Sequence, residues 1–277
     1  MTELKPKFTT DILFKSLFTQ YPKLLKHLTA ILLEIPLNRI TQFIIQNPEM
    51  TPDEIDKKFC RLDIRMMVNK QNINIEVQVK NEGDYPERAL FYWARMYSAS
   101  LPVKDEYRTL PRTISINILN FPLFKGNKDF HSEYRILDVE RYTQLTDKMI
   151  LHFFELPKIS RATGDDSLLL QWLSLFKAKT YEELERINEL GVPELSEAIG
   201  AYHTITASPE YQELERMRLK ASLDEANALS HADKRGEKRG AKAERKKWKI
   251  VVDGKDAELA DKDAELKKLR KQLADRE

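Results

Sequence analysis

Cysteine and long apolar runs are both scarce in this chain. A single cysteine, Cys60, stands among 277 residues, so no internal disulfide can form, and no Cys and His cluster has the spacing of a zinc site. A reducing, cytoplasmic location is therefore expected. The first residues lack the apolar segment of a signal peptide, and no apolar run approaches the roughly 18 residues that a membrane span needs. We expect no secretion and no membrane insertion.

Glycine and histidine are also few. With eight glycines, the chain has no glycine-rich phosphate loop of the Walker or Rossmann kind, so no nucleotide cofactor is expected. The five histidines are scattered, and His27 lies on an otherwise apolar helical segment. We expect it to be packed or peripheral, and catalysis by histidine is not indicated.

Charged residues, in contrast, are abundant. They make up 32% of the chain, with 46 Lys and Arg against 44 Asp and Glu. A length of 277 residues with 42% hydrophobic content suffices for one sizeable core with appended elements. The excess of charge predicts that one segment is mostly solvated.

Helix signals open the chain and return after its middle. Thr10 as N-cap and Pro22 at a first helical turn predict two helices, the second ending at Pro36, and a third is expected from Tyr85 to about Ser100. Further helices are expected from residue 166, after the capping box Thr180-x-x-Glu183 with Gly191 as C-cap, and from Ser208-Pro209-Glu210. Residues 113–121, 134–139 and 149–156 have the composition of strands.

Residues 61–68 and 73–80 alternate apolar and polar side chains and predict a hairpin. A turn centred on Lys70 and Gln71 sets Val68 opposite Ile73. The side chains then divide by parity, because neighbours along a strand point to opposite faces. The apolar face collects Leu62, Ile64, Met66, Val68, Ile73, Ile75, Val77 and Val79, and the polar face collects Asp63, Arg65, Asn74, Glu76, Gln78 and Lys80.

The polar face can support metal chemistry. Asp63 falls opposite Gln78 and diagonal to Glu76, a separation of roughly 7–8 Å from which two carboxylates can converge. Magnesium takes one or two carboxylates plus water and substrate phosphate, and such an ion activates water for phosphodiester hydrolysis. Gln78 or Lys80 could orient that water. The alternative is a solvent-exposed hairpin with one charged face.

Several segments carry a family resemblance. They are Asp11-x-x-Phe14-Lys15-x-x-Phe18, Asp63, Glu76-Val77-Gln78, Glu87-Arg88-Ala89-Leu90-Phe91-Tyr92-Trp93, residues 114–121, Phe154-Glu155-Leu156 and residues 225–230. Their order over roughly residues 8 to 230 resembles the PD-(D/E)XK nuclease superfamily, and within it the Rpn family of recombination-promoting nucleases and transposases. The resemblance implies an α/β fold, with a restriction-endonuclease-like mixed sheet flanked by helices and a helical C-terminal extension. It also implies Asp63 and Glu76 as ligands of Mg²⁺ or Mn²⁺, and DNA as substrate.

Other site residues keep two interpretations. Gln78 stands where the superfamily name specifies lysine. An amide can orient water but adds no positive charge. Lys80 could supply the missing charge, or it could be a surface lysine at a strand end. Asp11 is a possible third metal ligand or an acid favoured by the helix dipole. Glu155 is expected to be a structural partner more than a ligand.

The last part of the chain is highly charged. Residues 231–250 hold nine Lys or Arg against three acids, which could bind DNA phosphates or form a solvated helix face. After Gly254, leucines seven residues apart (Leu259, Leu266 and Leu273) predict a short, weak coiled coil, and thus a possible homo-oligomer. We expect a nuclease core at 1–160, a helical subdomain packed on it at 161–207, and a charged helical tail at 208–277.

Two functions remain open. The first is a metal-dependent DNA endonuclease that promotes recombination or acts in mobile-element or defence biology. The second is a catalytically degenerate DNA-binding or interaction protein that uses the basic tail. A transposase with strand transfer is implied only by the family resemblance, and fold-level analogy does not decide among such roles.

Overall fold

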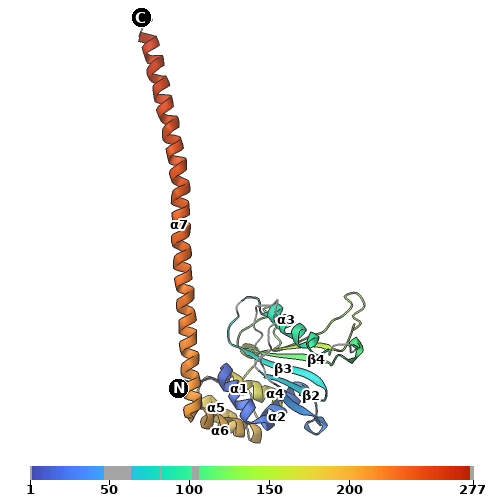
Figure 1. Ribbon diagram of the computed structural model, residues 1–277. Coiled ribbons are helices and arrows are strands. Elements are labelled where there is room, and N and C mark those ends of the chain that lie inside the picture. Colours follow the sequence, from blue (N-terminus) through green and yellow to red (C-terminus); the bar gives the residue numbers. More distant parts are fainter. Residues whose placement is uncertain (1, 47–63, 82, 102–105, 275–277) are drawn as a thin grey trace. The chain divides into compact units, whose positions relative to one another are not determined.

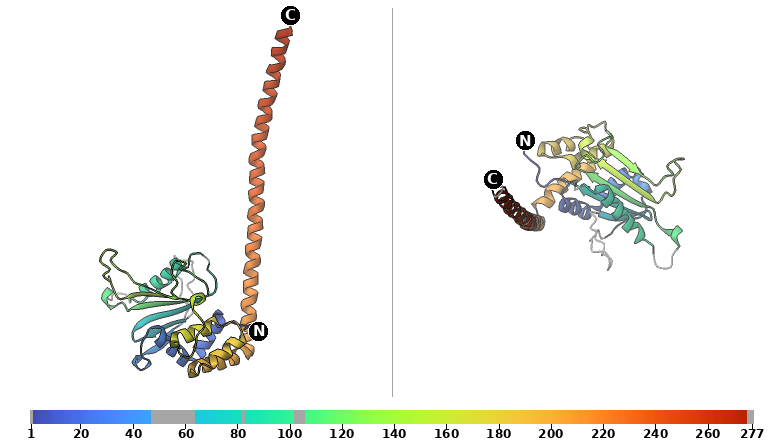
Figure 2. Two further views of the ribbon diagram at one scale, coloured as in Figure 1. Left: turned by 180° about the vertical axis from the view of Figure 1, so that it is seen from behind. Right: turned by 90° about the horizontal axis from the view of Figure 1, so that it is seen from above.

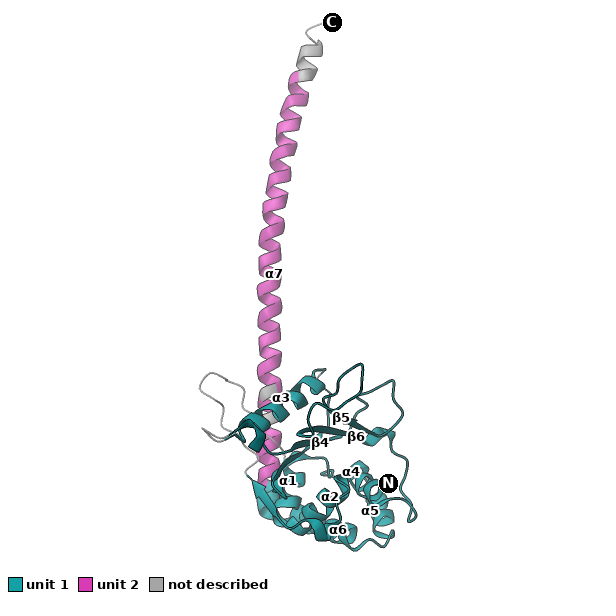
Figure 3. Ribbon diagram, turned by 90° about the vertical axis from the view of Figure 1, so that its right-hand side faces the viewer, with its two compact units in different colours: residues 1–212 teal, residues 213–277 magenta. Residues whose placement is uncertain are grey.

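The structure is a computed structural model that describes residues 2–46, 64–81, 83–101 and 106–274. Its described helices are α1 Asp11–Gln20, α2 Pro22–Leu32, α3 Tyr85–Ser98, α4 Leu168–Lys177, α5 Tyr181–Asn188, α6 Pro193–Ala207 and α7 Pro209–Ala274, with 3₁₀ turns at Leu37–Arg39, Tyr107–Thr109 and Leu156–Lys158. Its described strands are β1 Phe43–Gln46, β2 Ile64–Val68, β3 Gln71–Gln78, β4 Thr113–Leu119, β5 His131–Tyr134 and β6 Met149–Glu155. The chain divides into two compact units, Met1–Gln212 and Glu213–Glu277 (Figure 3).

The first unit is built on one mixed sheet with the order β1-β2-β3-β4-β6-β5. Strands β3, β4 and β6 run parallel to one another, while β1, β2 and β5 are antiparallel to their neighbours. The parallel strands lie at the centre and are buried along most of their length, as expected for strands covered on both faces. This mixed sheet confirms the α/β fold class.

Helices cover both faces of the sheet unequally. One face carries Ile73, Ile75 and Ile116, which belong to a large core with residues of α1, α2, α4, α5 and α6. The other face packs against α3 through a smaller cluster that includes Tyr85, Trp93 and Phe153. Figure 1 and Figure 2 show α3 on one side of the sheet and the remaining helices of this unit on the other.

Local signals account for several helix ends. α1 begins directly after Thr10, and α2 has Pro22 in its first turn. The capping box forms as predicted: Thr180 accepts from the backbone of Glu183, whose side chain accepts from the backbone of Thr180. Gly191 has the left-handed φ of +75° expected after a helix end. Ser208 caps α7 through its hydroxyl, which accepts from the backbone of Tyr211 at 3.2 Å.

The hairpin forms, but the predicted register is wrong by two residues. Met66 pairs with Ile73 and Val68 with Gln71, so the turn contains only Asn69 and Lys70. Both have positive φ, 49° and 66°, which is the backbone of a tight two-residue hairpin turn. The Asn69 side chain stabilises this turn by accepting from the backbone of Thr41 and Gln42. Because the shift is even, the division into two faces is unchanged.

Two strands at the edges of the sheet differ from expectation. β1 was not predicted; with four residues it is too short to show a clear alternation. The strand predicted at 134–139 is also wrong, because β5 ends at Tyr134. Beyond it Asp138 accepts from the backbone of Glu140 and Arg141 to form a turn. Val139 is 85% exposed there, so its preference for strands is not supported by packing.

The second unit, considered by itself, is a single helical segment. α7 continues as one helix through Gly236, Gly240 and Gly254 to Ala274, and its described side chains from residue 226 to 268 are exposed. No helix in the described ranges has the length and apolar character needed to cross a membrane.

Candidate active site on the polar face of the sheet

A row of buried polar side chains follows the α3 side of the sheet. β3 contributes Asn72, Asn74, Glu76 and Gln78, and β4 contributes Thr113, Ser115 and Asn117 at paired positions. All of them are buried except Gln78, which is half-buried. Alternation along β3 places these residues on the face opposite the large core. The parity prediction is thereby confirmed for the described residues of the hairpin.

Glu76 is the carboxylate of this row. It is 2% exposed and lies between Asn74 and Gln78 on the same face of β3. Burying a carboxylate is costly unless a cation, hydrogen bonds or a metal ion compensates for its lost hydration. Such a group in a strand that also carries polar neighbours is a strong candidate for chemistry.

Asp63, the predicted partner carboxylate, lies outside the described residues. In sequence it precedes Ile64, the first residue of β2, and Ile64 pairs with Ile75, which precedes Glu76. The predicted pairing of Asp63 with Gln78 assumed a register that differs from the observed pairing of residues 64–68 with 71–75. The role of Asp63 as a metal ligand stays a prediction.

Gln78 is held by a network that begins on α3. Arg88 Nη2 donates to Oε1 of Gln78 at 2.9 Å, and the guanidinium carbon of Arg88 lies 5.0 Å from the centre of the Tyr85 ring. The Tyr85 hydroxyl donates to Oδ1 of Asn117 at 2.8 Å. Asn117 in turn donates to the backbone carbonyl of His152 at 3.0 Å. The network joins α3, β3, β4 and β6 beside Glu76.

A second polar group crosses the sheet next to Glu76. Gln46, Arg65 and Asn74 are directly paired across β1, β2 and β3. Both side-chain polar atoms of Asn74 are buried and make no hydrogen bond in the described part of the chain. Burial lowers the pKa of Arg65, so this guanidinium also lies in a poorly hydrated place.

The remaining predicted residues lie apart from this row. Lys80 is exposed and follows the end of β3. Asp11 is the exposed first residue of α1, a helix whose buried side chains belong to the large core on the other face. Their catalytic and metal-binding roles stay predictions.

Glu155 is structural, as expected from the sequence. It is fully buried, forms an ion pair with Lys158, and accepts from the backbone of Leu123 and Phe124. It therefore fixes the loop that follows β4. His27 is packed as expected, since Trp172 Nε1 donates to its Nδ1 at 3.2 Å.

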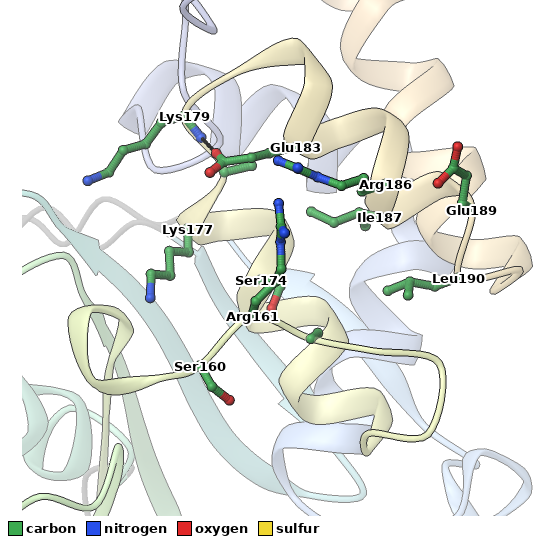
Figure 4. Close-up of a pocket in the computed structure, with 12 residues that line it drawn as sticks. Ser160, Arg161, Ser174, Lys177, Lys179, Glu183, Arg186, Ile187, Glu189 and Leu190 are labelled. Carbon is green, nitrogen blue, oxygen red and sulfur yellow. Dashed lines mark hydrogen bonds between the residues drawn. The ribbon is translucent and has the colours of Figure 1, made fainter. Parts of the chain in front are cut away.

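No group of three or more His, Cys, Asp or Glu side chains suited to a metal ion occurs among the described residues. A hollow of about 650 Å³ does occur, but between α4, α5 and the segment before α4 (Figure 4). Basic side chains surround it: Arg161, Lys177, Lys179 and Arg186. None of the polar residues of β3 lines it, so it is separate from the Glu76 row.

The sequence analysis placed Arg65 on the polar face but assigned it no role, and it did not identify Arg88 as a neighbour of Gln78. Arg88 occurs only within the helix that follows, and its position depends on how α3 packs on β3. An arginine one turn after a tyrosine in a helix is a common pattern, and it does not predict a contact with Gln78.

Comparison with known proteins agrees with this geometry. A family model described as PD-(D/E)XK nuclease family transposase matches residues 8–232. Searches of curated proteins and of solved structures found no match. The family match spans both the polar row on β3 and the helices that enclose the sheet. By this match over most of its length, the chain belongs to the PD-(D/E)XK nuclease family transposases.

Proposed function

We propose that this chain is a metal-dependent endonuclease that hydrolyses DNA phosphodiester bonds. The observation that carries the proposal is Glu76, a carboxylate 2% exposed on the polar face of β3 in a chain of a nuclease family. Its neighbours on that face are amides and hydroxyls, which suit a site for water and phosphate. The cellular role we propose is promotion of recombination, or a role in mobile-element or defence biology, in the cytoplasm.

Glu76 and Asp63 would hold the metal ion. Carboxylate oxygens are the ligands that Mg²⁺ and Mn²⁺ favour, and the polar residues that β3 and β4 contribute here include no His or Cys, the softer ligands. The ion, when bound, supplies Lewis acidity and lowers the pKa of a bound water. We also propose Asp11 as an additional metal ligand.

Gln78 is suited to orient the attacking water. An amide oxygen has two lone pairs, and Arg88 uses one of them, so the other can accept a hydrogen from water. In the reaction the water oxygen bonds to phosphorus as one phosphorus–oxygen ester bond breaks. One proton of the water moves to the leaving oxygen, which becomes a sugar hydroxyl, and the other is released to solvent as the second product takes the phosphate as a monoester.

The first test is plasmid cleavage by purified protein, with Mg²⁺ or Mn²⁺ and with EDTA. We expect nicking or linearisation that requires the metal ion and falls by at least about 10²-fold in both Asp63→Ala and Glu76→Gln. Glu76→Gln keeps the size of the side chain, and circular dichroism checks that the fold is intact. Equal activity in wild type and both variants would remove these residues from the site.

The second candidate function is that of a non-catalytic DNA-binding protein. It is favoured by α7, where Lys and Arg of the 231–250 stretch are exposed, and by the neutral side chain of Gln78. DNA binding that persists in EDTA, with no cleavage in either metal ion, would support it. Strand transfer would require joining of DNA ends, and the same assay with labelled ends detects it.

We also propose three domains: a nuclease core at 1–160, a helical subdomain at 161–207 and a charged tail at 208–277. The tail, in this proposal, mediates weak self-association. Leu259 and Leu266 are 61% and 51% exposed on α7 and lie seven residues apart, the spacing of one coiled-coil position. Light scattering of the full chain measures the mass. Unchanged mass after Leu259→Glu with Leu266→Glu would contradict association through this seam.

A further inference from the structure

Phosphodiester hydrolysis needs positive charge beside the reacting phosphate. Attack by water builds negative charge on the phosphate oxygens, and enzymes stabilise it with fixed cations. Position 78 provides only a neutral amide where the PD-(D/E)XK motif ends in lysine. Lys80 is exposed beyond the end of β3. A cation for this position has to reach it from another element.

Arg88 brings a guanidinium to position 78 from α3. Its Nη2 is 2.9 Å from Oε1 of Gln78, and the face of Tyr85 supports it at 5.0 Å. Tyr85 is itself buried and bonded through its hydroxyl to Asn117. Two elements therefore fix the cation, which limits the entropy lost when it engages a ligand.

The cation lies within reach of a phosphate at Glu76. Glu76 and Gln78 share one face of β3, so their Cα atoms are separated by roughly 7 Å along the strand. A guanidinium has five N–H groups in a planar fork whose geometry matches phosphate oxygens. Arg88 is only half-buried, which leaves it accessible to a substrate.

Resting on the proposed nuclease function, we propose that Arg88 is a catalytic residue that contacts the scissile phosphate in place of the motif's lysine. Gln78 and Tyr85 are its positioning residues. The pair Gln78–Arg88 thus divides two tasks that a single lysine performs: the amide orients water, and the guanidinium stabilises charge.

The test moves the charge from α3 to β3. Single-turnover cleavage of a labelled duplex in Mg²⁺ is compared for wild type, Arg88→Gln, and the double variant Gln78→Lys with Arg88→Gln. We expect Arg88→Gln to slow cleavage by about 10²-fold. The double variant should recover at least about tenfold, because its lysine returns a cation to position 78.

The outcomes separate the two levels of the proposal. Cleavage by Arg88→Gln at the wild-type rate would overturn the role of Arg88 alone. A slow Arg88→Gln with no recovery in the double variant would also overturn it, since that pattern shows Arg88 only holding α3 on the sheet. A wild type that cuts nothing in either metal ion overturns the nuclease function itself and the catalytic role with it.

A binding measurement provides a readout without cleavage. Fluorescence anisotropy of a labelled duplex in EDTA gives the dependence of affinity on salt, and a protein that neutralises one phosphate fewer has a slope smaller by about 0.9. We expect this smaller slope for Arg88→Gln. Arg95→Gln is the matched control: it changes the same charge on the same helix, where Arg95 lies over the Phe91 ring at 6.0 Å. We expect this control to keep the wild-type cleavage rate.

Discussion

Two buried asparagines on the polar face differ in how far their side-chain amides are hydrogen-bonded. Asn117, on β4, is bonded to Tyr85, Ser115 and the carbonyl of His152. Asn74, on β3, is 1% exposed, and neither of its side-chain polar atoms has a hydrogen-bond partner in the ranges described. A satisfied buried amide stabilises a fold, whereas an unsatisfied one costs the hydration that it has lost. Asn74 therefore has the character of a residue retained for binding.

This difference predicts opposite effects of one substitution. Asn74→Leu should raise the free energy of unfolding by about 1 kcal/mol, because it removes a desolvation cost. Asn117→Leu should lower it by about 1–3 kcal/mol, because it leaves Tyr85 without its acceptor. Urea unfolding of both variants measures the two values. A destabilised Asn74→Leu would show that its amide is satisfied in solution.

At the scale of elements, alternation predicted the faces of the hairpin but not its register. The period of two residues follows from the backbone alone, so Glu76 and Gln78 were placed on the correct face. The turn length instead depends on Asn69, whose side chain forms hydrogen bonds with Arg39, Thr41 and Gln42, a contact between segments far apart in sequence. The same limit applies to Arg88, which reaches Gln78 only because α3 packs on β3. The local sequence pattern therefore predicted Glu76 and Gln78, whereas the contact with Arg88 depends on tertiary packing and could not be predicted from it.

We predict that the stability of the fold depends on pH through His152, which lies on β6 next to the edge strand β5. His152 lies on β6 with Nδ1 3.0 Å from Nε2 of His131, and burial lowers its pKa from 6.5 to about 4. The neutral ring is thus favoured in the folded state, while the unfolded chain binds a proton already near pH 6.5. Its contribution to stability is complete above pH 6.5 and is lost as pH falls to about 4, a change on the order of 3 kcal/mol.

The measurement is urea unfolding of wild type and His152→Gln between pH 7 and pH 4. We expect the variant to lose less stability over this range, since its amide does not titrate. His203→Gln serves as control, because His203 is exposed on α6. Parallel curves for wild type and His152→Gln would show that His152 titrates alike in both states.

At the scale of the whole molecule, the chain combines two units with different physical character. Residues of Met1–Gln212 form the core and the candidate site, while the second unit contributes a charged helix whose side chains from residue 226 to 268 are exposed. A helix of this kind binds polyanions through counterion release and does not read sequence. Substitutions in the basic stretch of this helix should therefore change the affinity for DNA without changing the cleavage step.

The tail prediction separates affinity from chemistry. Changing Lys242, Lys246 and Lys249 together to Gln should weaken duplex binding in EDTA and reduce its salt slope by up to about 2.7, which is about 0.9 for each phosphate that is no longer neutralised. The single-turnover cleavage rate at saturating protein should stay unchanged, because none of these residues lies on the sheet.

The matched control changes three other lysines of the same helix, Lys262, Lys267 and Lys268. These lysines have acids as near neighbours and should contribute less to DNA binding. Equally weakened binding by both variants would mean that net charge alone attracts DNA, whereas an effect confined to the first variant would place the DNA-binding surface at residues 231–250.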